Sequence, residues 1–398
     1  MSACVFCRWI KWPLGMMAFV GSSPVFAQSV ADTLDTLQFH GFMSQALVIS
    51  DHNDFFGPSS SKGGSLQFYE LGLNASLRPS DNLLISAQVL SRRAGDDSAK
   101  PELDYGVIDY QVYSGNSTTL GIKIGRVKNP FGFYNETRDV PFTRTGILLP
   151  QSIYFDRTRT QSISGDGVAE YFEKRFTDSS IRFQVGWGLP QVDDNVKNTI
   201  LPDALPGSIK AKNSLISQLS YEYGGGRFIT AITYGKITAE YDSSSNGPGN
   251  GEFSYEPVIL SAQYNSMLWS LTSEIAVRKR EFSGIPDSRF NDSSTSGSWY
   301  LQYAYRFNNK WQGFLRYDAL ISDLSDMHGK EFASQGNGDD YSRYAFDNTL
   351  GLKWLVTPKF MLAAEYHNIE GTGWLYKPNE NDNKKYWDLF LFQASYRF

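Results

Sequence analysis

The sequence predicts an all-β fold, a transmembrane antiparallel β-barrel of about 16 strands. Three observations predict it: long strands with alternating apolar and polar residues, connections that alternate between short and long, and no apolar run of about 18 residues after the first 27. Strands of soluble proteins cluster near five or six residues, whereas a tilted strand needs about 9–11 residues to cross the hydrocarbon layer. The strands expected here have about ten residues or more, so a membrane barrel is favoured over a soluble sheet.

The first 27 residues have the pattern of a secretory signal peptide. Arg8 and Lys11 form a basic start, residues 14–20 form a short apolar stretch, and Val25-Phe26-Ala27 is a small-residue cleavage site. An N-terminal membrane anchor would need a longer apolar run. The pattern predicts Sec-type export and leaves residues 28–398 as a single barrel domain.

Both cysteines of the chain, Cys4 and Cys7, lie in this leader. The mature chain would have no thiol, no disulfide and no cysteine-based metal site. Removal of Arg8 and Lys11 changes the formal charge from −5 to 35 − 42 = −7. This charge argues against a nucleic-acid partner.

Alternation is clearest in the final strand, where one face has Phe390, Phe392, Ala394, Tyr396 and Phe398. The same pattern recurs at 83–89, 181–187, 299–305, 350–356 and 360–366. It is weak in 39–49, 103–113 and 166–176. Either the ends of these strands are misassigned, or this wall packs against a neighbouring subunit rather than lipid.

The connections predict the strand number. Seven short connections rich in turn-forming residues, beginning near 78–81 and ending near 357–359, alternate with eight long polar segments. Seven short and eight long connections imply about sixteen strands, with both chain ends on the short-turn side. No segment has the character of a linker between domains.

The carboxyl end resembles the signature that bacterial outer-membrane proteins share, carried here by Phe392, Tyr396 and Phe398. The resemblance implies recognition by the barrel-assembly machinery. The strand number and loop plan resemble the sixteen-stranded porins of Gram-negative bacteria. That resemblance implies a location among outer-membrane lipid, a homotrimer, no cofactor, and passive diffusion of small hydrophilic solutes or ions.

Residues 128–165 form the longest loop, and in the porins that the chain resembles this loop narrows the channel. Three prolines and many apolar residues indicate an ordered, packed loop. Its beginning, Gly125 to Gly132, is similar to a region of phosphate-selective porins. The arginine ladder of those proteins has no position-by-position match here, so no phosphate site is carried over.

The loop is locally basic, with six basic and three acidic residues between 126 and 159. Its candidate constriction residues are Arg126, Lys128, Glu136, Arg138, Asp139, Arg144, Asp156, Arg157 and Arg159. Basic residues at a narrow point would favour anions. The alternative is that these charges form ion pairs that hold the loop in place.

Strand alternation also predicts charged residues that face the lumen, because Arg or Lys at the lipid face costs about 2–4 kcal/mol at mid-membrane. These candidates are Lys123, Arg182, Arg306, Arg316, Asp318, Lys353 and Glu365.

Catalytic and metal sites are not predicted. None of the four histidines after the leader has a metal-binding spacing. His367 and Ser395, on neighbouring expected strands, leave open an outer-membrane enzyme of lipase or protease type. A closed barrel that acts as an anchor or adhesin is the other alternative to a channel.

Overall fold

The structure is a computed structural model that describes residues 34–95, 99–201, 205–375 and 382–398. The expected signal peptide lies outside the described residues. Within them, every strand pairs antiparallel with its neighbours in one continuous sheet. The sheet closes on itself because β1 (Gln38–Ser50) pairs with β17 (Tyr386–Arg397). The predicted all-β barrel is confirmed.

The other strands follow in chain order around the ring. They are β2 (Ser65–Ser80), β3 (Leu83–Ala94), β4 (Glu102–Ser114), β5 (Thr118–Lys128), β6 (Ser164–Arg175), β7 (Ser179–Pro190), β8 (Gly207–Ala211), β9 (Ser214–Tyr223), β10 (Phe228–Ser243), β11 (Gly251–Asn265), β12 (Trp269–Ser283), β13 (Ser293–Arg306), β14 (Trp311–Ile321), β15 (Tyr344–Thr357) and β16 (Phe360–Glu370).

Two of these segments, β8 and β9, form one interrupted strand. Both pair with β10, β9 along its first part and β8 along its last part. The interruption at Lys212 and Asn213 shifts the register by one residue, since Lys236 pairs with Leu215 whereas Ala239 pairs with Ala211. The wall described here therefore has sixteen strands, as the sequence predicts.

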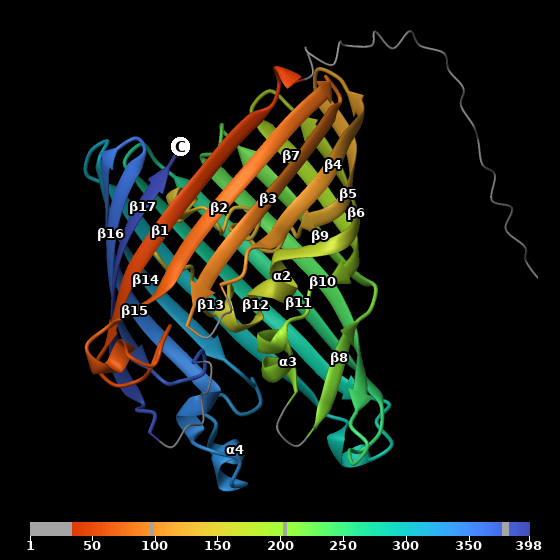
Figure 1. The fold of residues 1–398 in the computed structure, drawn as a ribbon, viewed down its shortest axis with the longest axis vertical. Coiled ribbons are helices and arrows are strands. Elements are labelled where there is room, and N and C mark those ends of the chain that lie inside the picture. Colours follow the sequence, from red (N-terminus) through yellow and green to blue (C-terminus); the bar gives the residue numbers. More distant parts are fainter. Residues whose placement is uncertain (1–33, 96–98, 202–204, 376–381) are drawn as a thin grey trace, which may run out of the picture.

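Short and long connections lie at opposite ends of the barrel. Figure 1 shows tight turns at the end where the C-terminus lies, and long loops with α4 (Lys330–Ser334) at the other end. Two further short helices, α2 (Arg159–Ile163) and α3 (Asp194–Ile200), belong to long connections. Short 3-10 turns lie at Ser60–Lys62, Pro141–Thr143, Asp156–Thr158, Ser288–Phe290 and Asp340–Arg343. The predicted asymmetry of the loops is confirmed.

The outer face of the wall is apolar. Leu315 and Leu350 are 58% and 56% exposed, and similar side chains recur on β2, β5, β11 and β12. Near the short turns, Trp311 and Trp354 stack with their rings 5.0 Å apart, as aromatic residues do at a membrane interface. In a soluble protein such a surface would be unstable, so the apolar belt indicates a barrel that spans a membrane.

Among the described residues, no helix is long and apolar enough to span a membrane.

The three weakly alternating segments are strands β1, β4 and β6. Bulges interrupt the register of β1 against β2 and of β4 against both of its neighbours. A bulge moves the following side chains to the other face. In β6 the outer face also contains polar residues, because Asp166 and Glu170 alternate there with Val168, which is 40% exposed.

The seam between the first and last strands is tightly packed. Gly41 and Phe398 exchange two backbone hydrogen bonds, at 3.0 and 3.2 Å. A Cβ on Gly41 would lie 2.3 Å from the Phe398 ring, so this position has room only for glycine. Phe392 and Tyr396 point outward, 50% and 38% exposed. Their role in assembly remains a prediction.

Candidate functional site: the inward loop and the outer vestibule

The connection from β5 to β6 folds into the barrel, where α2 forms its last turn (Figure 1). Its apolar segment lies among other side chains rather than in water, since Ile147, Leu148 and Tyr154 are each at most 3% exposed. Burial of apolar side chains stabilises the loop in this position. The expectation of an ordered, packed loop agrees with this placement.

One side of the loop is bound to strands β14 to β16. Arg316 donates to the Leu148 carbonyl at 3.1 Å, and Asp318 accepts from the Ser152 backbone N–H at 3.2 Å. Lys353 donates to the Arg144 carbonyl. Glu365 accepts the backbone N–H groups of Ile147 and Leu148. These four charged side chains hold the loop backbone against the wall.

A second anchor lies on β12. The fully buried Glu274 accepts hydrogen bonds from Phe133 N–H at 3.0 Å, from Tyr154 Oη at 2.6 Å and from Tyr300 Oη at 2.8 Å. Ser261 supplies a further bond, at 2.6 Å. A buried carboxylate with four donors is fully solvated by the protein, so this part of the loop has a single fixed position.

The opposite side of the loop faces β2 and β3 across a small polar gap. Arg144 forms a two-pronged ion pair with Glu70, with one contact of 3.1 Å. Arg92 pairs with Asp156 at 2.8 Å, and Arg138 lies 3.7 Å from the same carboxylate. The cavity among these groups has a volume of about 10 Å³, which is room for about one water molecule. The ion pairs therefore join the loop to the wall at its narrowest separation.

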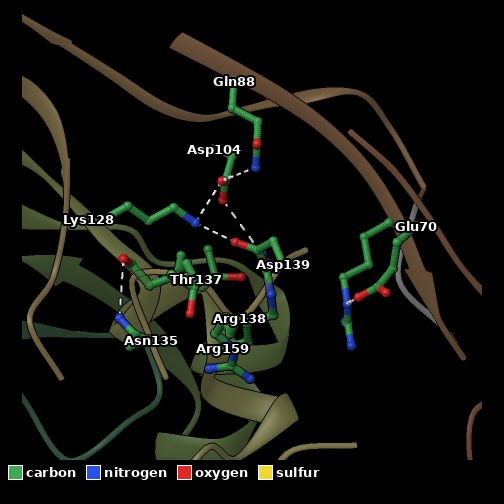
Figure 2. A network of polar contacts seen from close by, with 12 residues as sticks. Glu70, Gln88, Asp104, Lys128, Asn135, Thr137, Arg138, Asp139 and Arg159 are labelled. Carbon is green, nitrogen blue, oxygen red and sulfur yellow. Dashed lines mark hydrogen bonds and ion pairs between the residues drawn. The ribbon is translucent and has the colours of Figure 1, made fainter. Parts of the chain in front are cut away.

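Figure 2 shows the remaining ion pairs, at the start of the loop. Lys128 lies between Asp104 of β4, at 2.7 Å, and Asp139 of the loop. Arg159 also pairs with Asp139. Burial alone would raise the pKa of Asp139, but the charges of Arg159 and Lys128 outweigh it and hold this pKa well below its usual range. The two cations thus stabilise the ionised form of Asp139 against the cost of burial.

The structure brings together most of the predicted constriction residues. They form a network of two adjoining ion-pair clusters: Arg138, Arg144 and Asp156 with Glu70 and Arg92, and Lys128, Asp139 and Arg159 with Asp104. Arg157 lies apart from it, stacked on the Phe155 ring at 4.5 Å, and Glu136 is exposed. The geometry matches the alternative in which the loop charges form ion pairs.

The prediction that Arg126 lies at the constriction is wrong. Arg126 lies on the outer face of β5, in line with Ile124, which is 54% exposed. There it forms a two-pronged ion pair with Asp166 of β6, at 2.7 and 2.9 Å. Lys128, two residues later, is the last residue of the strand and turns inward with the loop. Because Arg126 and Lys128 are two positions apart, strand alternation would place both on the same face. They differ because the strand ends at Lys128, where the chain turns inward.

The predicted lumen residues divide into two groups. Arg316, Asp318, Lys353 and Glu365 face inward but lie beneath the loop, at most 8% exposed. Lys123 and Arg182 are half-buried on the opposite wall, each about 5.5 Å from the Tyr171 ring, and Arg306 is exposed near the short turns. The first group anchors the loop, whereas the second group contacts water.

Three network residues, Glu70, Arg92 and Asp104, were not among the predicted site residues. Glu70 and Arg92 face each other across β2 and β3. The sequence does contain a signal for these two residues, because each is a charged residue on the inward face of its strand. Asp104 gave no such signal because it lies at the bulge between β3 and β4.

His367 does not form the catalytic pair considered for it. His367 pairs across the sheet with Leu389, whereas Ser395 pairs with Met361 near the short turns. Both ring nitrogens of His367 contact carboxylates, Asp347 at 2.9 Å and Glu365 at 3.2 Å. The histidine thus belongs to the group that holds the loop.

Beyond the loop, the barrel opens into an outer vestibule of about 1560 Å³. The loop forms its floor, α3 and the ends of β10 to β12 form one side, and the connection before β15 forms the other. Among the residues that the structure describes, its lining contains one carboxylate, Asp292, and six basic residues, which are Lys128, Arg157, Arg278, Arg280, Arg289 and Arg343. Lys128 and Arg289 pair with carboxylates outside this lining, so the remaining arginines give the described lining its excess of positive charge within a chain of net negative charge.

No family model matches the sequence, and no curated protein matches it. Solved structures do match the fold. The anion-selective porin from Comamonas acidovorans is 9% identical with a TM-score of 0.56, over 91% of this chain and 99% of that chain. OmpF of Salmonella typhi in complex with daunomycin is 13% identical with a TM-score of 0.55, over 91% and 97%. The channel DcaP of Acinetobacter baumannii is 11% identical with a TM-score of 0.54, over 91% and 97%. The chain has the closed sixteen-stranded fold of these Gram-negative outer-membrane porins.

Proposed function

We propose that this protein is an outer-membrane porin, a passive diffusion channel for small hydrophilic solutes or ions with a preference for anions. One observation carries the proposal: a closed barrel with an apolar exterior encloses a large, basic, polar vestibule above an inward-folded loop. A water-filled opening inside an apolar wall gives charged solutes a path that lipid denies them. Sec-type export, assembly by the barrel-assembly machinery and a homotrimer belong to the same proposal.

The solute path follows the wall formed by β4 to β7. On the opposite wall the loop covers the inward side chains, and their exposure falls to a few per cent. On β4 to β7, Asp109, Lys123 and Arg182 keep contact with water. Since the buried ion pairs of the loop neutralise each other, selectivity at this level comes from Lys123 and Arg182 rather than from the loop arginines.

Single-channel recording in planar bilayers tests this proposal. We expect discrete conductance steps, and a reversal potential in a salt gradient that indicates anion preference. Exchange of both Lys123 and Arg182 for Gln should shift the reversal potential towards cations. Glu136→Gln is the control, because it changes the charge of the protein at an exposed loop residue away from Lys123 and Arg182. Cation selectivity of the wild type would contradict the anion preference.

A closed barrel that serves as an anchor or adhesin is the second candidate function. It is favoured by the number of bonds that fix the loop, from Glu70 on β2 and Glu365 on β16 to Glu274 on β12. Absence of conductance steps from correctly assembled protein would support this candidate and contradict the channel. An enzymatic role has weaker support, since the His367 site lacks a neighbouring serine nucleophile among the described residues.

A further inference from the structure

Three arginines of the vestibule converge without acidic partners. Arg278 and Arg280 lie two residues apart on the inward face of β12, and Arg343 ends the 3-10 turn before β15. All three line the same cavity. Among the described residues, none of the three forms an ion pair with a carboxylate within 4.0 Å. Most arginines of the inward loop, by contrast, are paired.

Each of the three guanidinium groups is held by weaker contacts that keep it in place. Arg278, 7% exposed, donates to Ser298 Oγ at 2.7 Å and to the Ser152 carbonyl at 2.5 Å. Arg280 donates to Ser294 Oγ at 2.5 Å. Arg343 stacks on the Phe332 ring at 4.7 Å. These contacts orient the guanidinium groups, while the carboxylates that act on Arg343, namely Asp323, Asp326 and Asp292, lie farther away than an ion pair.

The charges of Arg280 and Arg343 act on each other. Burial and the nearby Arg280 lower the pKa of Arg343, against the opposing effect of Asp323, Asp326 and Asp292. Two like charges held together raise the free energy of the empty site, and an anion between them removes that cost. Guanidinium groups present paired N–H donors that match the oxygens of a carboxylate, sulfonate or phosphate.

Apolar rings adjoin the arginines. Phe282 follows Arg280 on the same face of β12, and Phe332 lies under Arg343. Phe290 and Tyr255 line the same cavity. A solute whose oxyanion group contacts the arginines therefore has rings beside it for an apolar body. An inorganic anion would contact the arginines but would leave the rings without a partner.

We propose that the outer vestibule is a binding site for small organic anions, with the oxyanion group on Arg280 and Arg343, supported by Arg278, and the apolar body against Phe282 and Phe332. The inference rests on the proposed channel function, because it names the class of solute that the channel admits. Binding here would raise the local concentration of such solutes above the loop.

Calorimetric titration of the refolded, detergent-solubilised barrel with benzenesulfonate tests the site. We expect saturable binding that weakens with added salt, and at least a tenfold loss of affinity in the double variant Arg280→Gln/Arg343→Gln, because the variant removes the charge-assisted hydrogen bonds to the oxyanion. Benzyl alcohol, which has the ring without the charge, should not show saturable binding. Sulfate, which has the charge without the ring, should bind more weakly than benzenesulfonate.

Lys279→Gln is the matched control. It removes the same charge from the same strand, but Lys279 points to the outer face, where it pairs with Glu281 at 2.6 Å. Its affinity should equal that of the wild type. Three results would overturn the inference. The double variant could bind benzenesulfonate as tightly as the wild type does, the wild type could fail to bind it, or sulfate could bind as tightly as benzenesulfonate.

The same variants in planar bilayers separate this inference from the channel function. If the wild-type protein binds benzenesulfonate but gives no conductance steps, the binding site is supported and the channel function is contradicted. If the protein conducts ions but does not bind benzenesulfonate, only the binding site is contradicted.

Discussion

Single carboxylates fix the inward loop, and Glu365 is the clearest example. It accepts two consecutive backbone N–H groups, Ile147 and Leu148, and contacts His367 on the other side. Consecutive N–H groups directed at one carboxylate need that charge, because a buried donor without an acceptor costs about 1–3 kcal/mol. The position of the loop thus depends on side chains that lie more than 200 residues away in the chain.

Glu365→Gln should loosen the loop without opening the barrel. A glutamine keeps the size of the side chain but loses one acceptor oxygen and the negative charge. We expect the amides of Ile147 and Leu148 to exchange with deuterium about tenfold faster, which corresponds to about 1.4 kcal/mol. Hydrogen exchange followed by mass spectrometry measures this rate. Glu136→Gln, on the exposed part of the same loop, should leave it unchanged, and unchanged exchange in Glu365→Gln would show that the loop is held by other contacts.

At the scale of elements, the loop and the wall have complementary shapes. At Gly146 an added Cβ would lie 1.8 Å from Glu365 Oε1 and 2.6 Å from the Phe314 ring. The backbone of the loop can approach the wall this closely only because glycine has no side chain. This contact places the two following N–H groups against Glu365.

Gly146→Ala should therefore displace the loop, at a cost of about 1–3 kcal/mol for overpacking. We expect a lower midpoint temperature of unfolding, which the difference in gel mobility between unheated and heated samples measures. We also expect larger current fluctuations in the open channel. Gly186→Ala is the control, because its Cβ would meet only ordinary contacts, the nearest at 3.5 Å. A Gly146→Ala protein with wild-type stability and quiet current would indicate that the loop adapts freely.

Sequence alone predicts elements better than contacts between them. Alternation and connection length are local properties, so the sixteen strands could be predicted, whereas the inward course of the long loop was implied only by the resemblance to porins. The partners of the loop could not, because Glu70 and Arg92 become neighbours of Arg144 and Asp156 only after the ring has closed. The exact end of a strand is also hard to place from sequence, and Arg126, which was grouped with the constriction loop, belongs to β5 and to its outer face.

For the whole molecule, the assignment of faces decides stability. Leu352 is 43% exposed on the outer face, while the adjacent Lys353 is 8% exposed inside. Alternation of this kind around the ring gives a continuous apolar exterior. The free energy of the membrane-inserted barrel depends on this exterior more than on any single contact.

Leu352→Arg should destabilise the folded barrel by about 2–4 kcal/mol, because the charge would lie in hydrocarbon. Denaturant titration of the protein in lipid vesicles measures the difference. Gln263→Arg places the same side chain on the inward face, where Gln263 is half-buried, and should change stability little. If Gln263→Arg were the more damaging of the two, the inner and outer faces would have been exchanged.

The seam between β1 and β17 has a consequence for how the barrel closes. Gly41 and Phe398 are hydrogen-bonded across it, and β1 and β17 are the first and last strands of the described sheet. The ring therefore closes only after all the strands between β1 and β17 have joined the sheet. Until then two open strand edges and an apolar surface are available to other chains. Closure of the seam removes both edges at once, so the last pairing step also ends the risk that another chain adds a strand there.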